Sequence, residues 1–221
     1  MPKTQLIRSK RRSIALEIQE DGTLIVRAPH SLKEAVIQKF VSQKQEWIDK
    51  TTHRVLQRRE QFRPKQFVEG ETFLYLGKEY PLHIAPDMHG KLLFEDRFIL
   101  SERYLPKAKK LFERWYREEA FSVFTERCQF YSQKMGVRYQ VIKLSSAKQR
   151  WGSCNPKGSL CFNWRLILAP QEIVDYVVVH ELAHLKEPNH SSRFWNEVEG
   201  IFPDYRNAKK WLKENQGRLH F

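Results

Sequence analysis

Three histidines and one glutamate lie close together in the stretch VVVHELAHLKEPNH, residues 177–190. His180 and His184 are four residues apart, so on a helix they project from one face, about 40° apart around the axis. Glu181 follows His180 directly and would lie about 100° further around the same helix. This HExxH spacing is typical of a metal site in which two imidazoles bind the ion and the carboxylate lies beside it.

His190 can supply a third imidazole if the helix ends before it. We interpret EPN at residues 187–189 as that break, because proline disfavours helical conformation at the preceding residue. Three neutral imidazoles leave the fourth position of tetrahedral zinc open, which is the coordination of a catalytic site. The predicted zinc ligands are therefore His180, His184 and His190. Glu181 is the predicted general base, which takes a proton from zinc-activated water.

Metzincin peptidases share the distance from the second to the third histidine, but two of their features are missing here. Their motif has a glycine where this chain has Glu187. They also need a methionine turn after the motif, whereas Met1, Met88 and Met135 all precede it. The chain is therefore not a metzincin.

Further motifs flank the histidines, namely RWGSC at 150–154, a turn with Gly158, FNWRLILAP at 162–170 and SSRFW at 191–195. Together with HELAHLKEPNH they resemble the YgjP-like family of predicted metal-dependent hydrolases, related to the WLM and SprT groups of zincin-like metallopeptidases. The resemblance covers most of the chain and is densest from about residue 139 to 215. It implies a zincin-like core, with the three histidines as zinc ligands and Glu181 as catalytic base.

Hydrophobic periodicity predicts the elements of the first hundred residues. Residues 13–28 alternate apolar and polar side chains around Asp21-Gly22, which is typical of a β-hairpin. Residues 32–60 carry the apolar stripe of one long helix, with Ser31 as its N-cap. Short apolar segments from 67 to 100, separated by Gly, Pro and Asp, predict a meander of strands.

The second half of the chain is predicted to be mainly helical. Residues 105–135 form a helix that Gly136 closes, and its predicted apolar side consists of Leu111, Phe112, Trp115, Phe121, Phe124 and Phe130. The turn NPKG at 155–158 predicts a hairpin. Pro170 then opens the motif helix, which we expect to end at about Glu187. Helices over 191–202 and 204–217 follow.

These elements predict an α+β fold in two parts. Residues 1–100 form a β-rich N-terminal region with one long basic helix, and residues 101–221 form a zincin-like mixed α/β metallohydrolase core. No segment is apolar over the length that a bilayer requires, and the N-terminus lacks the apolar region of a signal peptide, so we expect a cytoplasmic protein. Cys128, Cys154 and Cys161 lack CxxC spacing, so they are expected to be reduced, buried thiols.

The net charge is +13, and residues 1–65 hold 15 Lys and Arg against 7 Asp and Glu, an excess of 8. Such a bias is typical of a protein with an anionic partner, and equally of a solvated basic surface. RSKRRS at residues 8–13, with Arg54, Arg58 and Arg59, is therefore a candidate contact with nucleic acid. No nucleic-acid-binding motif accompanies these residues.

Zinc-activated water can attack a peptide carbonyl or a phosphoanhydride, and the motif does not distinguish them. A metallopeptidase acting on a peptide or protein is the first hypothesis. A pyrophosphatase-type nucleotide hydrolase is the alternative, favoured by Lys148, Arg150 and Arg165 near the presumed cleft. A nucleic-acid-associated protein that carries the hydrolase site is a third. Candidates for a second oxyanion donor are Arg150, Arg165, Tyr176 and Tyr205.

Two neighbouring features add to this site. Residues 151–153 would lie on a strand with which an extended peptide can pair, where Gly152 allows a close approach. An equal alternative is a tight bend or small-residue packing at this glycine. Asp175, Glu197 and Glu199 are the nearest acids, and Glu197 is the expected acceptor for an imidazole N–H.

Overall fold

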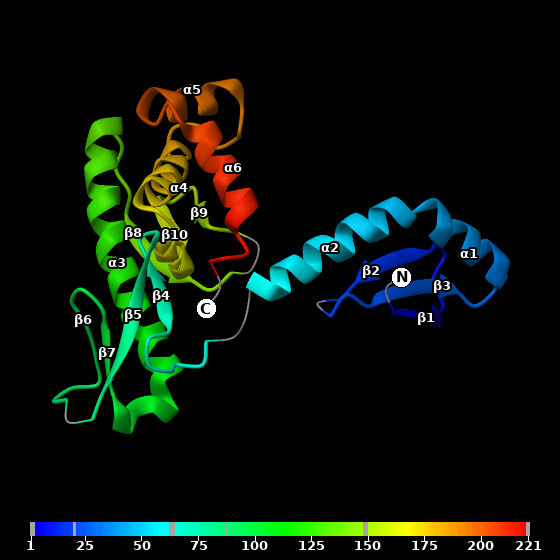
Figure 1. The fold of residues 1–221 in the computed structure, drawn as a ribbon. Helices are drawn as coiled ribbons and strands as arrows, with labels where there is room; N and C mark the ends of the chain where they lie inside the picture. Colours follow the sequence, from blue (N-terminus) through cyan, green and yellow to red (C-terminus); the bar gives the residue numbers. More distant parts are fainter. Residues whose placement is uncertain (1–2, 20, 62–64, 87, 148–149, 220–221) are drawn as a thin grey trace. The chain divides into compact units, whose positions relative to one another are not determined.

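The computed structural model describes residues 3–19, 21–61, 65–86, 88–147 and 150–219. The chain forms two compact units, Met1–Arg63 and Pro64–Phe221, whose elements are labelled in Figure 1. Both contain helices and strands, which confirms the predicted α+β class. Among the helices in the described part of the chain, none is long and apolar enough to cross a membrane.

The N-terminal unit combines a three-stranded sheet with two helices. Its elements are β1 (Thr4–Ser9), β2 (Ala15–Ile18), β3 (Leu24–Pro29), α1 (Glu34–Gln43) and α2 (Gln45–Gln61). The predicted hairpin is confirmed, since β2 pairs antiparallel to β3 and Gly22 adopts a φ of 85° in the turn. β1 pairs in parallel with the other edge of β3. The sequence does not predict β1, because its side chains are exposed or half-buried and show no alternation.

The single long helix predicted over residues 32–60 is wrong, because Lys44 separates α1 from α2. This residue has φ −103° and ψ 11°, outside the helical range. The predicted N-cap is also wrong, since Lys33 and not Ser31 precedes α1. Ile37 and Ile48 both enter the small core of this unit. In a straight helix they would lie about 16 Å apart along the axis, so the break lets both reach the same core.

The four strands predicted between residues 67 and 100 are present, but the predicted meander is wrong. They are β4 (Thr72–Tyr75), β5 (Lys78–Ala85), β6 (Leu92–Phe94) and β7 (Phe98–Ser101), in the order β4-β5-β7-β6. β7 pairs in parallel with β5 and antiparallel with β6. The burial of side chains agrees with this order. Phe98 and Leu100 of the inner strand β7 are fully buried, whereas Leu93 of the edge strand β6 is 45% exposed.

The helix predicted over residues 105–135 is confirmed as α3 (Ala108–Met135), which ends at Gly136 with a φ of 65°. A short 3-10 helix, η1 (Glu102–Lys107), precedes it. The apolar side predicted for α3 is wrong at Phe121 and Phe130, which are 50% and 51% exposed. The buried side is a narrower stripe with a spacing of three or four residues, formed by Phe112, Tyr116, Ala120, Phe124, Cys128, Tyr131 and Met135.

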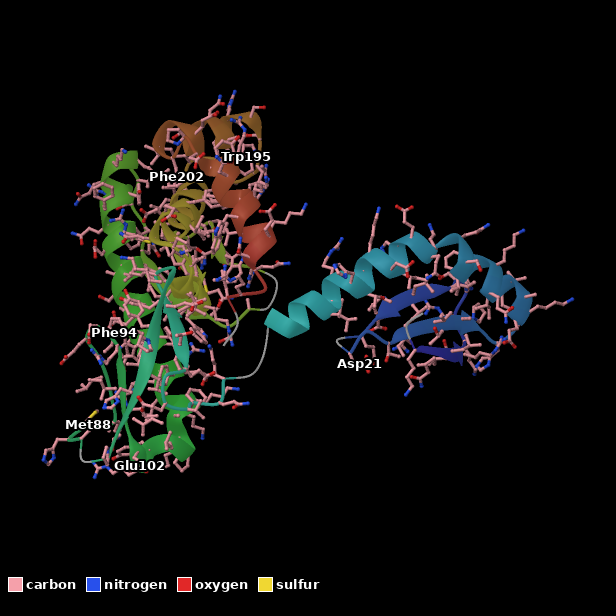
Figure 2. All side chains as sticks on the ribbon, in the orientation of Figure 1. Asp21, Met88, Phe94, Glu102, Trp195 and Phe202 are labelled. Atoms are coloured by element: carbon pink, nitrogen blue, oxygen red, sulfur yellow. The ribbon has the colours of Figure 1, made fainter. Side chains whose placement is uncertain are left out.

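Aromatic rings join the β4–β7 sheet to α3. The Phe73 and Phe112 rings stack with centroids 4.3 Å apart, and Phe98 meets Trp115 edge-on at 4.8 Å. Phe94, labelled in Figure 2, lies 5.0 Å from Trp115. These strands thus share one core with the helices that follow. The compact units divide at residues 63 and 64, whereas the sequence predicts a division at 100 and 101. The change from strand to helix near residue 100 occurs inside a single core.

The remaining elements surround the motif. They are β8 (Val141–Ser145), β9 (Gly152–Cys154), β10 (Ser159–Asn163), the 3-10 helix η2 (Trp164–Leu168), α4 (Gln171–Ala183), α5 (Ser192–Ile201) and α6 (Tyr205–Asn215). The strands pair in the order β8-β10-β9, so β9 is an edge strand. The predicted NPKG hairpin is confirmed, since the Gly158 N–H donates to the Asn155 carbonyl at 2.9 Å. β9 packs against α4.

Two backbone hydrogen bonds connect the turn between β4 and β5 to η2, directly before α4 begins. The Leu76 N–H donates to the Ile167 carbonyl at 2.9 Å, and the Gly77 N–H donates to the Leu168 carbonyl at 3.2 Å. Gly77 has a φ of 79°, and a Cβ there would lie 2.8 Å from Pro170 Cγ. Only glycine suits both the backbone conformation and this close contact.

Candidate metal centre

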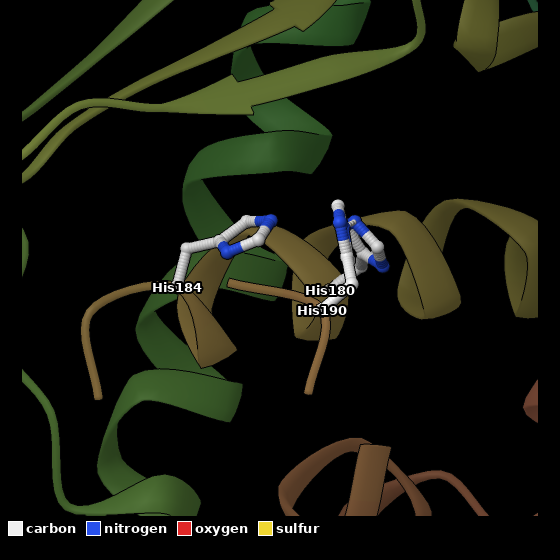
Figure 3. A group of neighbouring side chains, drawn as sticks. All are labelled: His180, His184 and His190. Carbon is white, nitrogen blue, oxygen red and sulfur yellow. Dashed lines mark hydrogen bonds between the residues drawn. The ribbon is translucent and has the colours of Figure 1, made fainter. Parts of the chain in front are cut away.

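The three predicted ligands come together at the C-terminal end of α4. Figure 3 shows the imidazoles of His180 and His184 on one side of the helix, with His190 reaching them from the following loop. One ligand atom from each histidine lies within 4.8 Å of the others, and the Nε2 atoms of His180 and His190 are 3.0 Å apart. In the described part of the chain, no other group of three His, Cys, Asp or Glu residues is arranged to share an ion.

The helix that carries the motif ends earlier than predicted. α4 ends at Ala183, with His184 as its C-cap, and not at about Glu187. The N–H groups of residues 185–186 donate to carbonyls three residues earlier at 3.0 Å, which is the tighter turn of a 3-10 helix. The helix therefore ends before the backbone reaches Pro188, and this tight turn starts the path that returns His190 to the site.

A backbone carbonyl, and not a carboxylate, orients His184. Its Nδ1 lies 3.2 Å from the Glu187 carbonyl oxygen. A carbonyl can only accept, so this contact places the proton on Nδ1 and leaves Nε2 with a lone pair for a metal. Glu197 accepts from Lys186 Nζ at 2.8 Å, and among the described residues no imidazole donates to it.

The other two acids near the motif are also engaged elsewhere. Asp175 accepts from Arg127 at 2.6 and 2.8 Å and from the Tyr131 hydroxyl at 3.1 Å, which ties α4 to α3. Glu199 accepts from Arg206 at 2.8 Å. Both carboxylates therefore contribute to the scaffold of the site.

Aromatic side chains of α5 and α6 hold the imidazoles in place. Phe194 is fully buried, and its ring centroid lies 4.5 to 4.9 Å from those of all three imidazoles. Trp195, labelled in Figure 2, stacks on His190 at 5.8 Å and 25°. Tyr205 stacks on the Trp195 ring at 5.0 Å. His190 lies on a loop, so this stacking supplies orientation that the helix provides for the other two histidines.

The protonation of His180 fits a metal ligand. Burial lowers the pKa of its imidazole to about 3, helped by the positive charges of His184, His190 and Lys209. Burial also lowers the pKa of His190. The Nδ1 atom of His180 is buried and has no hydrogen-bond partner among the described residues. Neutral imidazoles that converge in this way are donors suited to zinc and similar divalent ions, so the residues present fit a metal.

Glu181 is buried beside the histidines, against the backbone of β9. Burial raises the pKa of its carboxyl group to about 8, while the charge of Arg150 acts to lower it. A Cβ at Gly152 would overlap the Glu181 carboxylate, lying 2.6 Å from Cγ and 2.7 Å from Cδ. The alternative expected at Gly152, packing that requires a small residue, is present, and the neighbour is Glu181. The approach of a substrate peptide to this strand stays a prediction. Sequence reasoning missed this pairing, although the glycine in RWGSC was its signal.

The three cysteines are free thiols, and Cys128 is buried as predicted. The predicted burial is wrong for Cys154 and Cys161, which are half-buried. Burial raises the pKa of Cys128 to about 12. Burial and then the charge of Glu181 raise the pKa of Cys154, on β9, to about 11. Thiolates are the ligating form, so neither thiol competes with the histidines for a metal at neutral pH.

The candidates for a second oxyanion donor differ in their surroundings. The Tyr176 ring lies 5.9 Å from the His180 ring, and burial raises the pKa of its hydroxyl to about 12, so it remains a donor. Tyr205 is engaged in the aromatic stack. Arg165 lies over the Trp164 ring with its guanidinium carbon 4.4 Å from the centroid.

The structure describes only some of the basic residues that are candidate contacts with phosphate or nucleic acid. Lys148 lies outside the described residues, as do the side chains of Arg58 and Arg59. Arg54 is exposed on α2. Arg8 donates to three backbone carbonyls in the segment 29–32 at 2.7 to 3.3 Å, so it serves the fold of the N-terminal unit.

The sequence matches a family model described as YgjP-like, metallopeptidase domain, over residues 12–215. The metallopeptidase zymogen of Pyrococcus abyssi abylysin is 25% identical, with a TM-score of 0.39, over 42% of this chain and 95% of that chain. The zymogen of Methanocaldococcus jannaschii jannalysin is 19% identical, with a TM-score of 0.39, over 42% and 96%. No curated protein matches the sequence.

Proposed function

The chain belongs to the YgjP-like metallopeptidase domain family, and on this basis we propose that it is a zinc-dependent peptidase. The proposed zinc ligands are His180, His184 and His190, and the proposed general base is Glu181. The observation that carries this proposal is the convergence of three imidazoles next to a buried carboxylate. A buried carboxyl group with a raised pKa is suited to accept and return a proton near neutral pH.

In the proposed mechanism a bound zinc ion would lower the pKa of water to about 7 and offset the negative charge that develops on the substrate carbonyl. The Glu181 carboxylate takes a proton from the attacking water and later donates it to the leaving amine. Gly152 leaves room for that carboxylate, and burial keeps bulk water away from it. The Glu187 carbonyl and Trp195 hold two of the imidazoles in position.

Peptide is the proposed substrate because of the edge strand beside the site. β9 pairs with β10 on one side only, and it packs against the helix that carries the histidines. An extended peptide can add to such an edge through backbone hydrogen bonds. A carbonyl of that peptide would then lie near Glu181, which contacts Gly152 of the same strand.

Three measurements on zinc-loaded protein test this proposal. We expect about one zinc per chain by elemental analysis, lost in His184→Ala and retained in the exposed control His89→Ala. We expect cleavage within a peptide library, and Glu181→Gln should keep the metal but lose most of the turnover, by at least about a hundredfold. Full zinc content in His184→Ala, or undiminished cleavage by Glu181→Gln, would contradict the proposed roles.

Hydrolysis of a nucleotide phosphoanhydride is the alternative activity. Arg150 favours it, because a cation whose charge acts on Glu181 could also contact a phosphate. Offering nucleoside triphosphates beside the peptide library separates the two activities. Release of phosphate or pyrophosphate without any peptide cleavage would replace the peptidase proposal.

A further inference from the structure

Several basic side chains lie around the metal centre, and they differ in whether a carboxylate neutralises them. Lys186 pairs with Glu197 and Arg206 pairs with Glu199, each at 2.8 Å. Lys209, on α6, is exposed, and none of the carboxylates in the described part of the chain pairs with it. Its charge is therefore available to another molecule.

Stacked aromatic rings place the ammonium group of Lys209 next to the histidines. Lys209 Nζ lies 4.7 Å above the centre of the Trp195 ring. The same indole stacks on His190. A cation is attracted to the face of an indole, so this contact favours one position for an otherwise flexible side chain.

A second basic side chain lies on the β9 side of the site. Arg150 directly precedes the Trp151–Cys154 segment and is exposed, and no carboxylate in the described residues pairs with it. Arg150 lies two residues before Gly152, whose backbone contacts the Glu181 side chain. The two cations are thus associated with different parts of the site, Lys209 through the indole that stacks on His190 and Arg150 through the strand that contacts Glu181.

Two uncompensated cations beside a divalent metal are electrostatically unfavourable when the site holds no substrate. A negatively charged group on the substrate would offset this repulsion and form charge-assisted hydrogen bonds with Lys209. A neutral substrate would leave the repulsion in place. The charges of the site therefore select among substrates.

We propose that Lys209, supported by Arg150, binds a carboxylate of the substrate, so that the site selects acidic peptides. This inference rests on the proposed peptidase function. A carboxylate can come from an Asp or Glu side chain near the scissile bond or from the C-terminus of the peptide. Both offer the same chemistry to an ammonium group, and the peptides below distinguish them.

The test uses internally quenched peptides of one sequence with Glu or Gln on either side of the scissile bond, each as a free acid and as an amide. We expect wild-type, zinc-loaded protein to have a kcat/KM about tenfold to a hundredfold higher for peptides with the recognised carboxylate, as expected for a charge-assisted hydrogen bond. Lys209→Met should bring that ratio close to one, and Lys209→Arg should retain most of it.

Lys210→Met is the matched control, because Lys210 is the next residue on α6 and is equally exposed. This variant removes the same charge and should leave the ratio of kcat/KM between acidic and neutral peptides unchanged. Equal cleavage of acidic and neutral peptides by the wild type would overturn the proposal. An equal loss of the ratio in both lysine variants would also overturn it, since this would indicate a general effect of net charge.

Peptide binding to zinc-loaded Glu181→Gln, followed by fluorescence anisotropy, separates this proposal from the peptidase function. Tighter binding of acidic peptides, lost in the Glu181→Gln, Lys209→Met double variant, supports recognition even if the wild type cleaves none of them. Carboxylate-dependent binding without any cleavage would overturn the peptidase function but not the recognition of acidic peptides. Binding without dependence on the carboxylate, or no binding at all, would overturn the recognition of acidic peptides.

Discussion

At Gly152 the backbone of β9 leaves no space between itself and the Glu181 carboxylate. We expect Gly152→Ala to displace this carboxylate, because the added methyl group meets Cγ and Cδ as well as Oε1. Turnover should fall at least tenfold while zinc content stays near that of the wild type. The overlap should also destabilise the fold by about 1–3 kcal/mol, measured by urea unfolding.

Two variants distinguish this local effect from a general sensitivity to alanine. Gly200→Ala, where the added Cβ has no neighbour within 4 Å, should keep full activity. In the Glu181→Ala background, which lacks the clashing atoms, Gly152→Ala should cost little stability. If Gly152→Ala is equally destabilising in both backgrounds, the contact with Glu181 is not its cause.

The thiol of Cys154 reports on the charge of the neighbouring base. Its pKa is raised to about 11, so its alkylation by iodoacetamide should be slow at neutral pH and should rise about tenfold per pH unit toward pH 11. An ionised Glu181 contributes to this raised pKa, so Glu181→Gln should lower the pKa and speed alkylation at about pH 9. Peptide mapping by mass spectrometry follows each cysteine separately, and an unchanged rate at Cys154 would argue against this coupling.

The proposed ligands could be predicted from their spacing, because four residues on a helix fix the direction of two side chains. The surroundings of Glu181 could not be predicted from local spacing. Its burial depends on how β9 packs against α4, and that packing joins residues about thirty positions apart. The orientation of His184 likewise depends on where the helix ends, and the sequence placed that end about four residues too late.

At the scale of elements, the ion pair between Arg127 and Asp175 ties α3 to the motif helix. Asp175 is 8% exposed and the Arg127 side chain 16%, so Asp175→Ala leaves a largely buried guanidinium with only the longer 3.6 Å carboxylate contact to Glu126. We expect a loss of about 2–4 kcal/mol in the free energy of unfolding, measured with urea. The exposed pair Arg114–Glu118 on the same helix is the control, and Glu118→Ala should cost at most about 0.5 kcal/mol. Equal losses in the two variants would contradict the difference in burial.

Local sequence signals predicted most individual elements. They failed where contacts between residues distant in sequence determine the structure. The Asp-Gly turn, Asn155 with Gly158, and Gly136 each mark an element end that the structure confirms. No glycine or proline marks the break at Lys44, since that break serves the joint burial of two isoleucines. The parallel pairing of β5 with β7 was not predictable from alternation, because the sequences of β6 and β7 are both apolar.

At the scale of the whole molecule, the structure distinguishes two ways of shortening the chain. A fragment of residues 65–221 keeps all of the large core, whereas a fragment of residues 101–221 loses Phe73, Leu82 and Phe98. We expect the longer fragment to unfold cooperatively by circular dichroism and to bind zinc. The shorter fragment should do neither. A stable fragment of residues 101–221 would support the division predicted from the sequence.

The family match spans residues 12–215, so it includes most of the N-terminal unit as well as the metal centre. The N-terminal unit has its own small core, and it supplies none of the three histidines. Its contact with nucleic acid stays a prediction. A steep loss of binding with rising salt would support phosphate contacts, and a flat response would count against them.

The turn between β4 and β5 also provides a means of observing the motif helix from a distance. The amide hydrogens of Leu76 and Gly77 are bound to carbonyls of η2, directly before α4. They can exchange with deuterated water only when that contact opens, so their exchange rates measure how often the start of the helix is released. Any ligand that restrains α4 would slow these two amides, although they belong to a different sheet from β9.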